Sequence, residues 1–89
     1  MSPKKSTTTA PDPRNKMIAD RIVELRKQAG FSSQEDFANE FGIGRMSYWR
    51  AESGKTNITT KLLFQVLDAH GLSLAEFFAP LNERYQKEG

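Results

Sequence analysis

The chain has 89 residues, 37% of them hydrophobic and 27% charged, which predicts one small globular domain. Its net charge of +2 is slight, and the lack of cysteine excludes disulfides and thiolate metal sites. No stretch approaches the roughly 18 apolar residues of a membrane span and no secretory signal opens the chain, so we expect a cytoplasmic protein without membrane contact.

The first helix is predicted over 13–29, after a basic arm (1–12) that is too polar to offset the entropy of ordering it and is therefore expected to be flexible. Asp12 is a suitable cap, and Pro13 suits the first helical position, where its missing N–H is no loss. Apolar residues then recur at spacings of four, three and four until Gly30 ends the helix. These residues are Ile18, Ile22, Leu25 and Ala29.

Two further helices are predicted, over about 34–41 and 45–53, with a tight corner between them. Ser32 or Ser33 caps the earlier one, because each serine is followed three residues later by an acidic residue. Gly42 ends it, since a sharp turn needs a left-handed residue and glycine adopts that conformation without steric cost. The inner faces of the two helices are expected to consist of Phe37, Ala38, Phe41, Tyr48 and Ala51.

A fourth helix is predicted from residue 59 or 60 to His70, just before Gly71. Its apolar residues wrap more than one face, which predicts a central position in the domain. His70 is the only histidine, and it is expected to pack as a helix cap because a metal ligand would need partners at suitable spacing. We predict neither a metal site nor a cofactor.

A short fifth helix is opened by a capping box of Ser73 and Glu76. Pro80 is expected to interrupt or kink it, and residues 82–89 are expected to form a frayed tail. Because no segment shows the period-two alternation of a strand, the fold class is all-α, a compact five-helix domain over about 13–81.

The segment 34–53 combines two helices that cross closely at a corner. Such a crossing needs a small residue at the nearest approach, which Ala38 supplies, and a glycine in the turn. If Tyr48 and Ala51 face the core, helical spacing places the opposite face of the third helix toward the solvent. Positive charge is also concentrated here, because residues 42–61 hold four basic residues and one acidic residue. The outward residues are Arg45, Met46, Trp49 and Arg50.

Over about residues 18–79 the chain resembles the helix-turn-helix family of phage repressors and Cro-like regulators. The resemblance rests on residues that this family places in its second helix, turn and third helix, here Gln34, Ala38, Gly42, Tyr48, Glu52 and Gly54. It implies a lambda-repressor-like fold and sequence-specific binding of double-stranded DNA to regulate transcription, usually as a dimer. For the localisation it implies a cytoplasmic, nucleoid-associated protein.

Within this family the third helix enters the major groove, where arginine can donate two hydrogen bonds to guanine and apolar side chains can contact thymine methyl groups. The predicted base contacts are Arg45, Met46, Trp49 and Arg50. The predicted phosphate contacts are Gln34, Ser47, Lys55 and Lys61. Packing on the second helix or against a protein partner stays open for Trp49. For residues 2–5, which include Lys4 and Lys5, two interpretations stay open: contact with a minor groove or the phosphate backbone, and a disordered start.

One such module covers only a few base pairs, so we expect a two-fold homodimer. The candidate dimer surface consists of Phe77, Phe78, Leu81 and Tyr85, with the alternative that Phe77 and Leu81 close the core of the monomer. An antitoxin or adaptor of the same fold, with a toxin or regulator protein as its main ligand, is the second interpretation of function. No enzyme is expected, because the acidic residues of the second helix lie on an exposed face and converge with no nucleophile or base.

Overall fold

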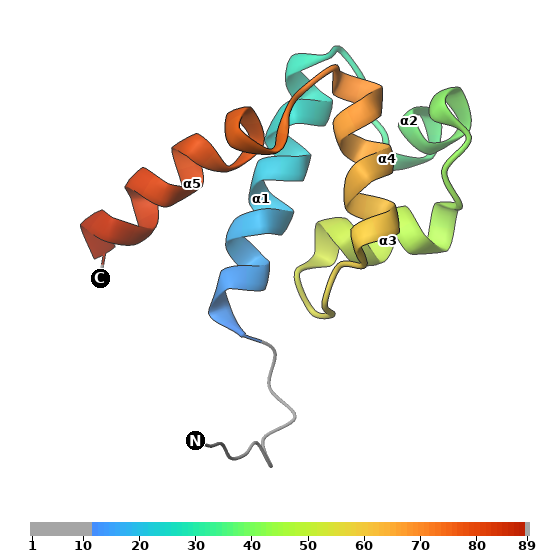
Figure 1. The fold of residues 1–89 in the computed structure, drawn as a ribbon. Helices are drawn as coiled ribbons and strands as arrows, with labels where there is room; N and C mark the ends of the chain where they lie inside the picture. Colours follow the sequence, from blue (N-terminus) through green and yellow to red (C-terminus); the bar gives the residue numbers. More distant parts are fainter. Residues whose placement is uncertain (1–11, 89) are drawn as a thin grey trace.

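The computed structural model describes residues 12–88, the last four as helical backbone, and consists of five helices (Figure 1). In chain order these are α1 (Pro13–Gln28), α2 (Gln34–Phe41), α3 (Arg45–Ser53), α4 (Thr60–His70) and α5 (Leu74–Glu88). Residues 12–88 contain no strand, and the predicted all-α fold is confirmed. In this range no single helix is long and apolar enough to cross a membrane. Helix α4 and residues 74–84 of α5 reach the required length and hydropathy only when taken together, and the two segments meet at an angle of 104°.

The helix boundaries follow from local capping. The Asp12 side chain accepts from the backbone N–H of residue 14, and Thr59 caps α4 in the same manner. Of the two serines considered for α2, Ser33 is the cap and accepts from the backbone N–H of residue 36 at 3.0 Å. Ser73 and Glu76 bond reciprocally at 2.8 and 3.1 Å, which is the predicted capping box.

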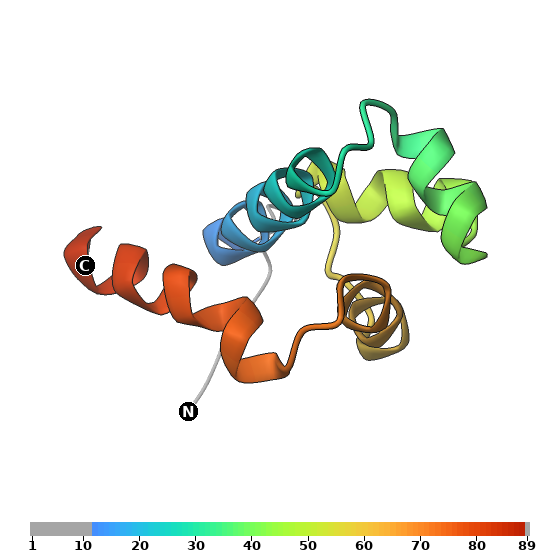
Figure 2. The ribbon, with the colours of Figure 1, turned by 90° about the horizontal axis from the view of Figure 1, so that it is seen from above.

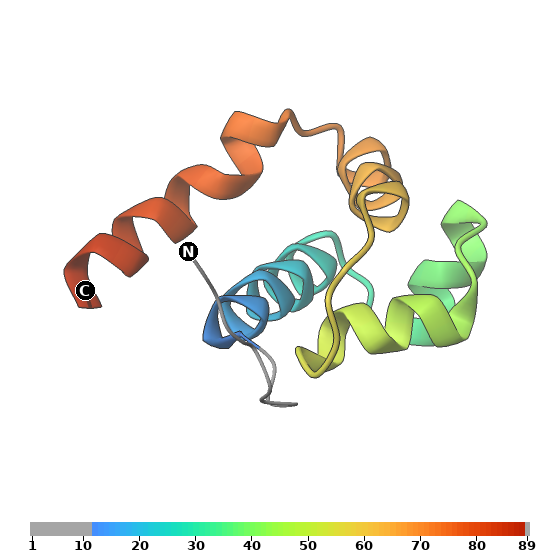
Figure 3. The same cartoon turned by 60° about the horizontal axis from the view of Figure 1, so that its bottom comes forward.

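The core lies among the five helices, and its largest fully buried side chains come from every helix. Figures 2 and 3 show α5 on the far side of α1 from α2 and α3. The fourth helix, predicted to be central, buries Leu62, Leu63, Val66 and Leu67. The amount of apolar surface on a helix indicates burial but does not indicate which neighbours bury it. The largest fully buried side chains of the core are Tyr48, Phe37, Phe77, Ile22 and Val66.

Two residues expected inside the core are exposed. Phe41 is 41% exposed because it ends α2, although its ring contacts those of Phe37 and Phe31, with centroids 4.8 and 5.8 Å away. Ala29 is exposed because it is the C-cap of α1 and lies past the last helical turn. Ala19, which the predicted apolar stripe omitted, is fully buried.

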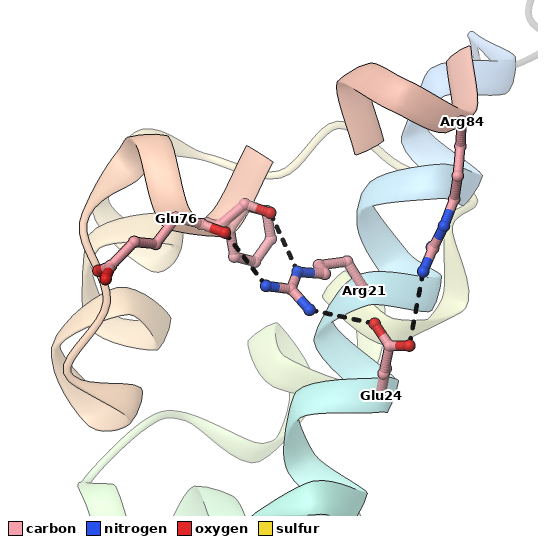
Figure 4. A network of polar contacts seen from close by, with 5 residues as sticks. Arg21, Glu24, Glu76 and Arg84 are labelled. Atoms are coloured by element: carbon pink, nitrogen blue, oxygen red, sulfur yellow. Dashed lines mark hydrogen bonds and ion pairs between the residues drawn. The ribbon is translucent and has the colours of Figure 1, made fainter. Parts of the chain in front are cut away.

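The prediction of a frayed tail over 82–89 was wrong for residues 82–88, because α5 continues through Pro80 to Glu88. Proline has no N–H, so the carbonyl of Glu76, four residues earlier, lacks its helical donor. Arg21 in α1 supplies one from its Nη2 at 3.2 Å, and its Nε donates to the next carbonyl, that of Phe77, at 3.0 Å (Figure 4). A tertiary contact thus satisfies the backbone that proline disrupts.

A second contact holds the later part of α5 near α1. Glu24 accepts from Arg21 at 3.1 Å and lies 3.5 Å from the guanidinium of Arg84 (Figure 4). Beyond this point the C-terminal end of α5 projects away from the other helices (Figure 1).

Candidate nucleic-acid interface

The inner side of α3 is anchored by a buried polar network. Arg26 in α1 donates from Nε and Nη2 to the two carboxylate oxygens of Glu52 in α3, at 2.7 and 3.2 Å. Gln34 in α2 donates a third hydrogen bond to Glu52 at 2.9 Å, and Arg26 also donates to the carbonyl of Phe31 at 2.9 Å. Arg26 is 6% exposed and Glu52 8% exposed, so the network joins three helices inside the domain.

The protonation of this network follows from its surroundings. Burial alone would raise the pKa of Glu52, but hydrogen bonds from Arg26 and Gln34 outweigh it and hold that pKa below its ordinary value. The same carboxylate raises the pKa of Arg26. Burial raises the pKa of Tyr48, whose ring lies in the same part of the core. The pair therefore stays ionised at neutral pH and holds α3 in one orientation.

The C-terminal end of α3 packs closely against α1. Gly54 follows α3 with a left-handed φ of 73°, and a Cβ there would lie 3.1 Å from the Cα of Lys16 and 3.3 Å from the Cβ of Ala19. Glycine is needed at this position both for its backbone conformation and for the close approach of the two helices. This contact fixes the second end of α3.

The outward side of α3 carries the predicted base-contacting residues. Met46 is 61% exposed and Trp49 is 49% exposed, while Arg45 and Arg50 are also exposed. Burial of Tyr48 and Ala51 on the opposite side explains this orientation. Trp49 is about half exposed and borders, with Gln34 and Glu35 of α2, the hollow between the two helices.

The outward residues border two separate hollows. One lies between α2 and the start of α3 and is lined by Gln34, Glu35, Arg45, Met46 and Trp49. The other lies between α3 and α4, where Ser47, Arg50 and Lys61 come together near the start of α4 with Asn57 and Thr59.

The predicted phosphate contacts are divided among these places. Ser47 and Lys61 share the hollow between α3 and α4. The side-chain amide of Gln34 instead points to buried Glu52. Lys55 is exposed in the loop that follows α3.

Glu35 is the residue of this surface that the sequence analysis missed. Its Oε2 accepts from Nη1 of Arg45 at 2.6 Å, although both side chains are more than half exposed. The sequence placed Glu35 only on an acidic face of α2, ten residues from Arg45. The crossing of α2 and α3 is what brings the two together, and no spacing rule within one helix would have indicated it.

The predicted dimer residues that the structure describes differ in their burial. Phe77 and Leu81 are buried in the monomer, at 0% and 5% exposed, so the alternative that they close its core holds for these two. Phe78 is half-buried beside a hollow between α1 and α5, with Met17 and Ile18 on the α1 side. The side chain of Tyr85 and the arm over 1–11, with Lys4 and Lys5, lie outside the described residues.

Comparisons with known proteins agree on the fold and the family. The helix-turn-helix family model matches residues 22–77. Control protein C.MunI of Mycoplasma sp is 30% identical over 66 residues, which cover 74% of this chain and 89% of that protein. Plasmid copy control protein CopR of Streptococcus agalactiae is 36% identical over 64 residues, which cover 72% of this chain and 68% of CopR.

A solved structure has the same arrangement of helices. A mutant of the restriction-modification controller protein C.Esp1396I superimposes with a TM-score of 0.74 at 23% identity, over 89% of this chain and 99% of that chain. The likeness supports the all-α architecture described above.

Proposed function

Because this chain belongs to the helix-turn-helix family of DNA-binding regulators, we propose that it binds double-stranded DNA sequence-specifically and regulates transcription with α3 in the major groove. One observation carries the proposal. The inner side of α3 is anchored to two other helices through Glu52, while Arg45, Met46, Trp49 and Arg50 all face outward. A rigid helix with cations and apolar side chains outward suits the edges of base pairs.

Bases and phosphates are assigned to different parts of the surface. Arg45 and Arg50 donate to guanine, and Met46 and Trp49 contact thymine methyl groups or sugars. Ser47 and Lys61 hold a phosphate in the hollow between α3 and α4, and Lys55 holds one from the loop. The side chain of Gln34 is occupied by Glu52, so its contribution is the free backbone N–H at the start of α2.

The proposed active form is a homodimer, because one recognition helix covers too few base pairs for specificity. The apolar hollow between α1 and α5, which Met17, Ile18 and Phe78 border, is the proposed contact surface. The proposed location is the cytoplasm, bound to the nucleoid.

A second candidate function is favoured by the exposed Trp49 and Met46. Large apolar side chains on a helix surface also suit a protein ligand, as in an antitoxin or adaptor. A DNA complex weakens steeply as salt rises, whereas an apolar protein complex survives high salt. A partner that copurifies with the chain at high salt and is lost in Trp49→Ala would favour this second function.

Selection of binding sites from random duplex DNA tests the proposal. The parent chain should enrich one sequence, and two half-sites about 34 Å apart would indicate a dimer. Arg45→Ala and Arg50→Ala should each lose about 1–3 kcal/mol of discrimination at one base pair. Lys27→Ala, an exposed cation near the end of α1, is the matched control and should bind as the parent does. If both arginine variants bind as well as the parent, α3 is not the recognition helix.

A further inference from the structure

We propose that Glu35 is a positioning residue for DNA reading: it holds the guanidinium of Arg45 in the orientation that contacts guanine. The inference rests on the proposed function and adds a residue to it. It starts from the ion pair between Glu35 Oε2 and Arg45 Nη1, at 2.6 Å. An acidic side chain on a surface that meets a polyanion is unfavourable unless it has a specific task.

The geometry of the pair leaves Arg45 able to bind a base. A guanidinium has five N–H donors, and Glu35 accepts from Nη1. Within the part of the chain that the structure describes, Nε and Nη2 of Arg45 have no protein acceptor. The edge formed by Nε and Nη2 carries two parallel donors, which match the O6 and N7 acceptors of guanine. Arg45 can therefore hold Glu35 and guanine at the same time.

The position of the pair in the fold supports the same role. Arg45 is the first residue of α3, and its N-cap, Gly44, provides no side chain to restrain it. Glu35 lies in the first turn of α2. Gln34, the residue before it, donates a hydrogen bond to buried Glu52 and so anchors this end of the helix. A carboxylate on this anchored helix restrains a long exposed side chain before DNA arrives, so less rotamer freedom is lost on binding.

The alternative is that Glu35 only stabilises α2. An acidic residue in the first turn of a helix interacts favourably with the helix dipole, and neighbouring Asp36 does the same. That role would change the stability of the fold but would not change the preference for one base over another. Base discrimination is therefore the readout that separates the two roles.

The test uses the full chain, the duplex that it selects, single base-pair variants of that duplex and a shuffled duplex, with binding followed by fluorescence anisotropy. Arg45→Ala first identifies the base pair that Arg45 reads. Glu35→Gln should reduce discrimination at that same pair by about tenfold, a substantial share of what a bidentate arginine contributes. Binding to shuffled DNA should stay equal or become tighter, because a negative charge is lost. In the Arg45→Ala background, Glu35→Gln should have no further effect on discrimination.

Two further variants separate geometry from charge and folding. Glu35→Asp keeps the charge but shortens the reach by one methylene, and it should lose discrimination as Glu35→Gln does. Glu40→Gln makes the same chemical change at an exposed position at the other end of α2, and it should keep full discrimination. Circular dichroism and thermal unfolding should show the parent fold in all three variants.

The inference is overturned if Glu35→Gln tightens binding to selected and shuffled DNA equally while every base preference is kept. Glu35 would then be a competing acid and not a positioning residue, and the proposed function would stand. If the parent chain selects no sequence from random duplex DNA, the proposed function itself fails.

Discussion

Arg26 in α1 and Glu52 in α3 form a buried ion pair with two hydrogen bonds, at 2.7 and 3.2 Å. The two residues are 26 positions apart in the chain. Gln34 of α2 bonds to the same carboxylate, so one side chain links three helices. The orientation of α3 thus depends on a polar contact inside the domain as well as on apolar packing.

Removing one partner of this pair should be strongly destabilising. Glu52→Gln leaves the Arg26 guanidinium buried without a counter-charge, and we expect the free energy of unfolding to fall by about 3–5 kcal/mol. Urea unfolding followed by circular dichroism measures it. Glu83→Gln, at an exposed position of α5, is the control and should unfold as the parent does. Equal midpoints for Glu52→Gln and the control would contradict the prediction.

The stabilisation that the Glu52 carboxylate provides should depend on pH. The folded pKa of Glu52 lies below the ordinary value of 4.5, so the pair stabilises the fold above that pH and loses this effect as pH falls through the folded pKa. The difference in unfolding free energy between parent and Glu52→Gln should therefore shrink as pH is lowered below 4.5. A difference that stays constant down to acid unfolding would contradict this assignment.

A side chain at Gly54 should be more costly than one at Gly42. Both residues have left-handed φ angles, 73° and 67°, so either alanine substitution should lose about 1–2 kcal/mol from backbone strain. Only at Gly54 would the new Cβ meet α1, at 3.1 Å from the Cα of Lys16. The unfolding free energy should therefore fall further in Gly54→Ala than in Gly42→Ala. Equal losses would show that α1 and α3 separate without cost.

Arg21 should be required for the part of α5 beyond Pro80. Arg21→Leu leaves the carbonyl of Glu76 without its donor and removes a hydrogen bond to the carbonyl of Phe77, and we expect a loss of about 1–3 kcal/mol. Amide hydrogen exchange of residues 81–88 should become faster. Pro80→Ala restores an N–H in the helix, so it should rescue most of the loss in the Arg21→Leu background. No rescue would mean that Arg21 acts through Glu24 and Arg84 instead.

His70 should make the stability of the fold depend on pH near neutrality. Its ring stacks on Phe37, with the ring centroids 5.0 Å apart. Burial lowers the pKa of His70 below 6.5, and the positive charge of Arg21 lowers it further. The unfolded chain therefore takes up the proton first, so stability is full above pH 6.5 and falls as pH drops through the folded pKa. His70→Phe keeps a stacked ring without a titrating group. Urea midpoints between pH 7.5 and 5.5 should fall in the parent and stay level in His70→Phe.

Lys61 should contribute to DNA affinity without contributing to sequence preference. A phosphate contact weakens binding about equally for all sequences when it is removed, and it lowers the slope of log affinity against log salt by about 1. Lys61→Ala should show both effects on selected and shuffled duplexes, measured by anisotropy across a salt series. Lys27→Ala is the control, with an unchanged slope. A loss confined to the selected duplex would make Lys61 a base contact.

Features that depend on neighbouring residues in the chain were predicted from the sequence. Asp12, Thr59 and the pair of Ser73 and Glu76 cap helices because a cap needs only a side chain and a backbone N–H a few positions away. The inward position of Tyr48 follows from helical periodicity in the same way, and with it the outward face of α3. The all-α fold could be predicted on this basis, and the helix-turn-helix family from the resemblance of residues 34–54 to its motif.

Features that depend on residues far apart in the chain needed the folded structure. Helix crossing brings Glu35 to Arg45, and helix packing brings Arg26 to Glu52. The same holds for Arg21, whose contact with two carbonyls lets α5 pass through Pro80 where local rules predict its end. The burial of Phe77 within this chain also needed the folded structure. A helical stripe shows which residues avoid water, but it does not show whether this chain or a partner covers them. Local chemistry therefore set where the helices begin and which faces they present, whereas their packing set which polar groups meet.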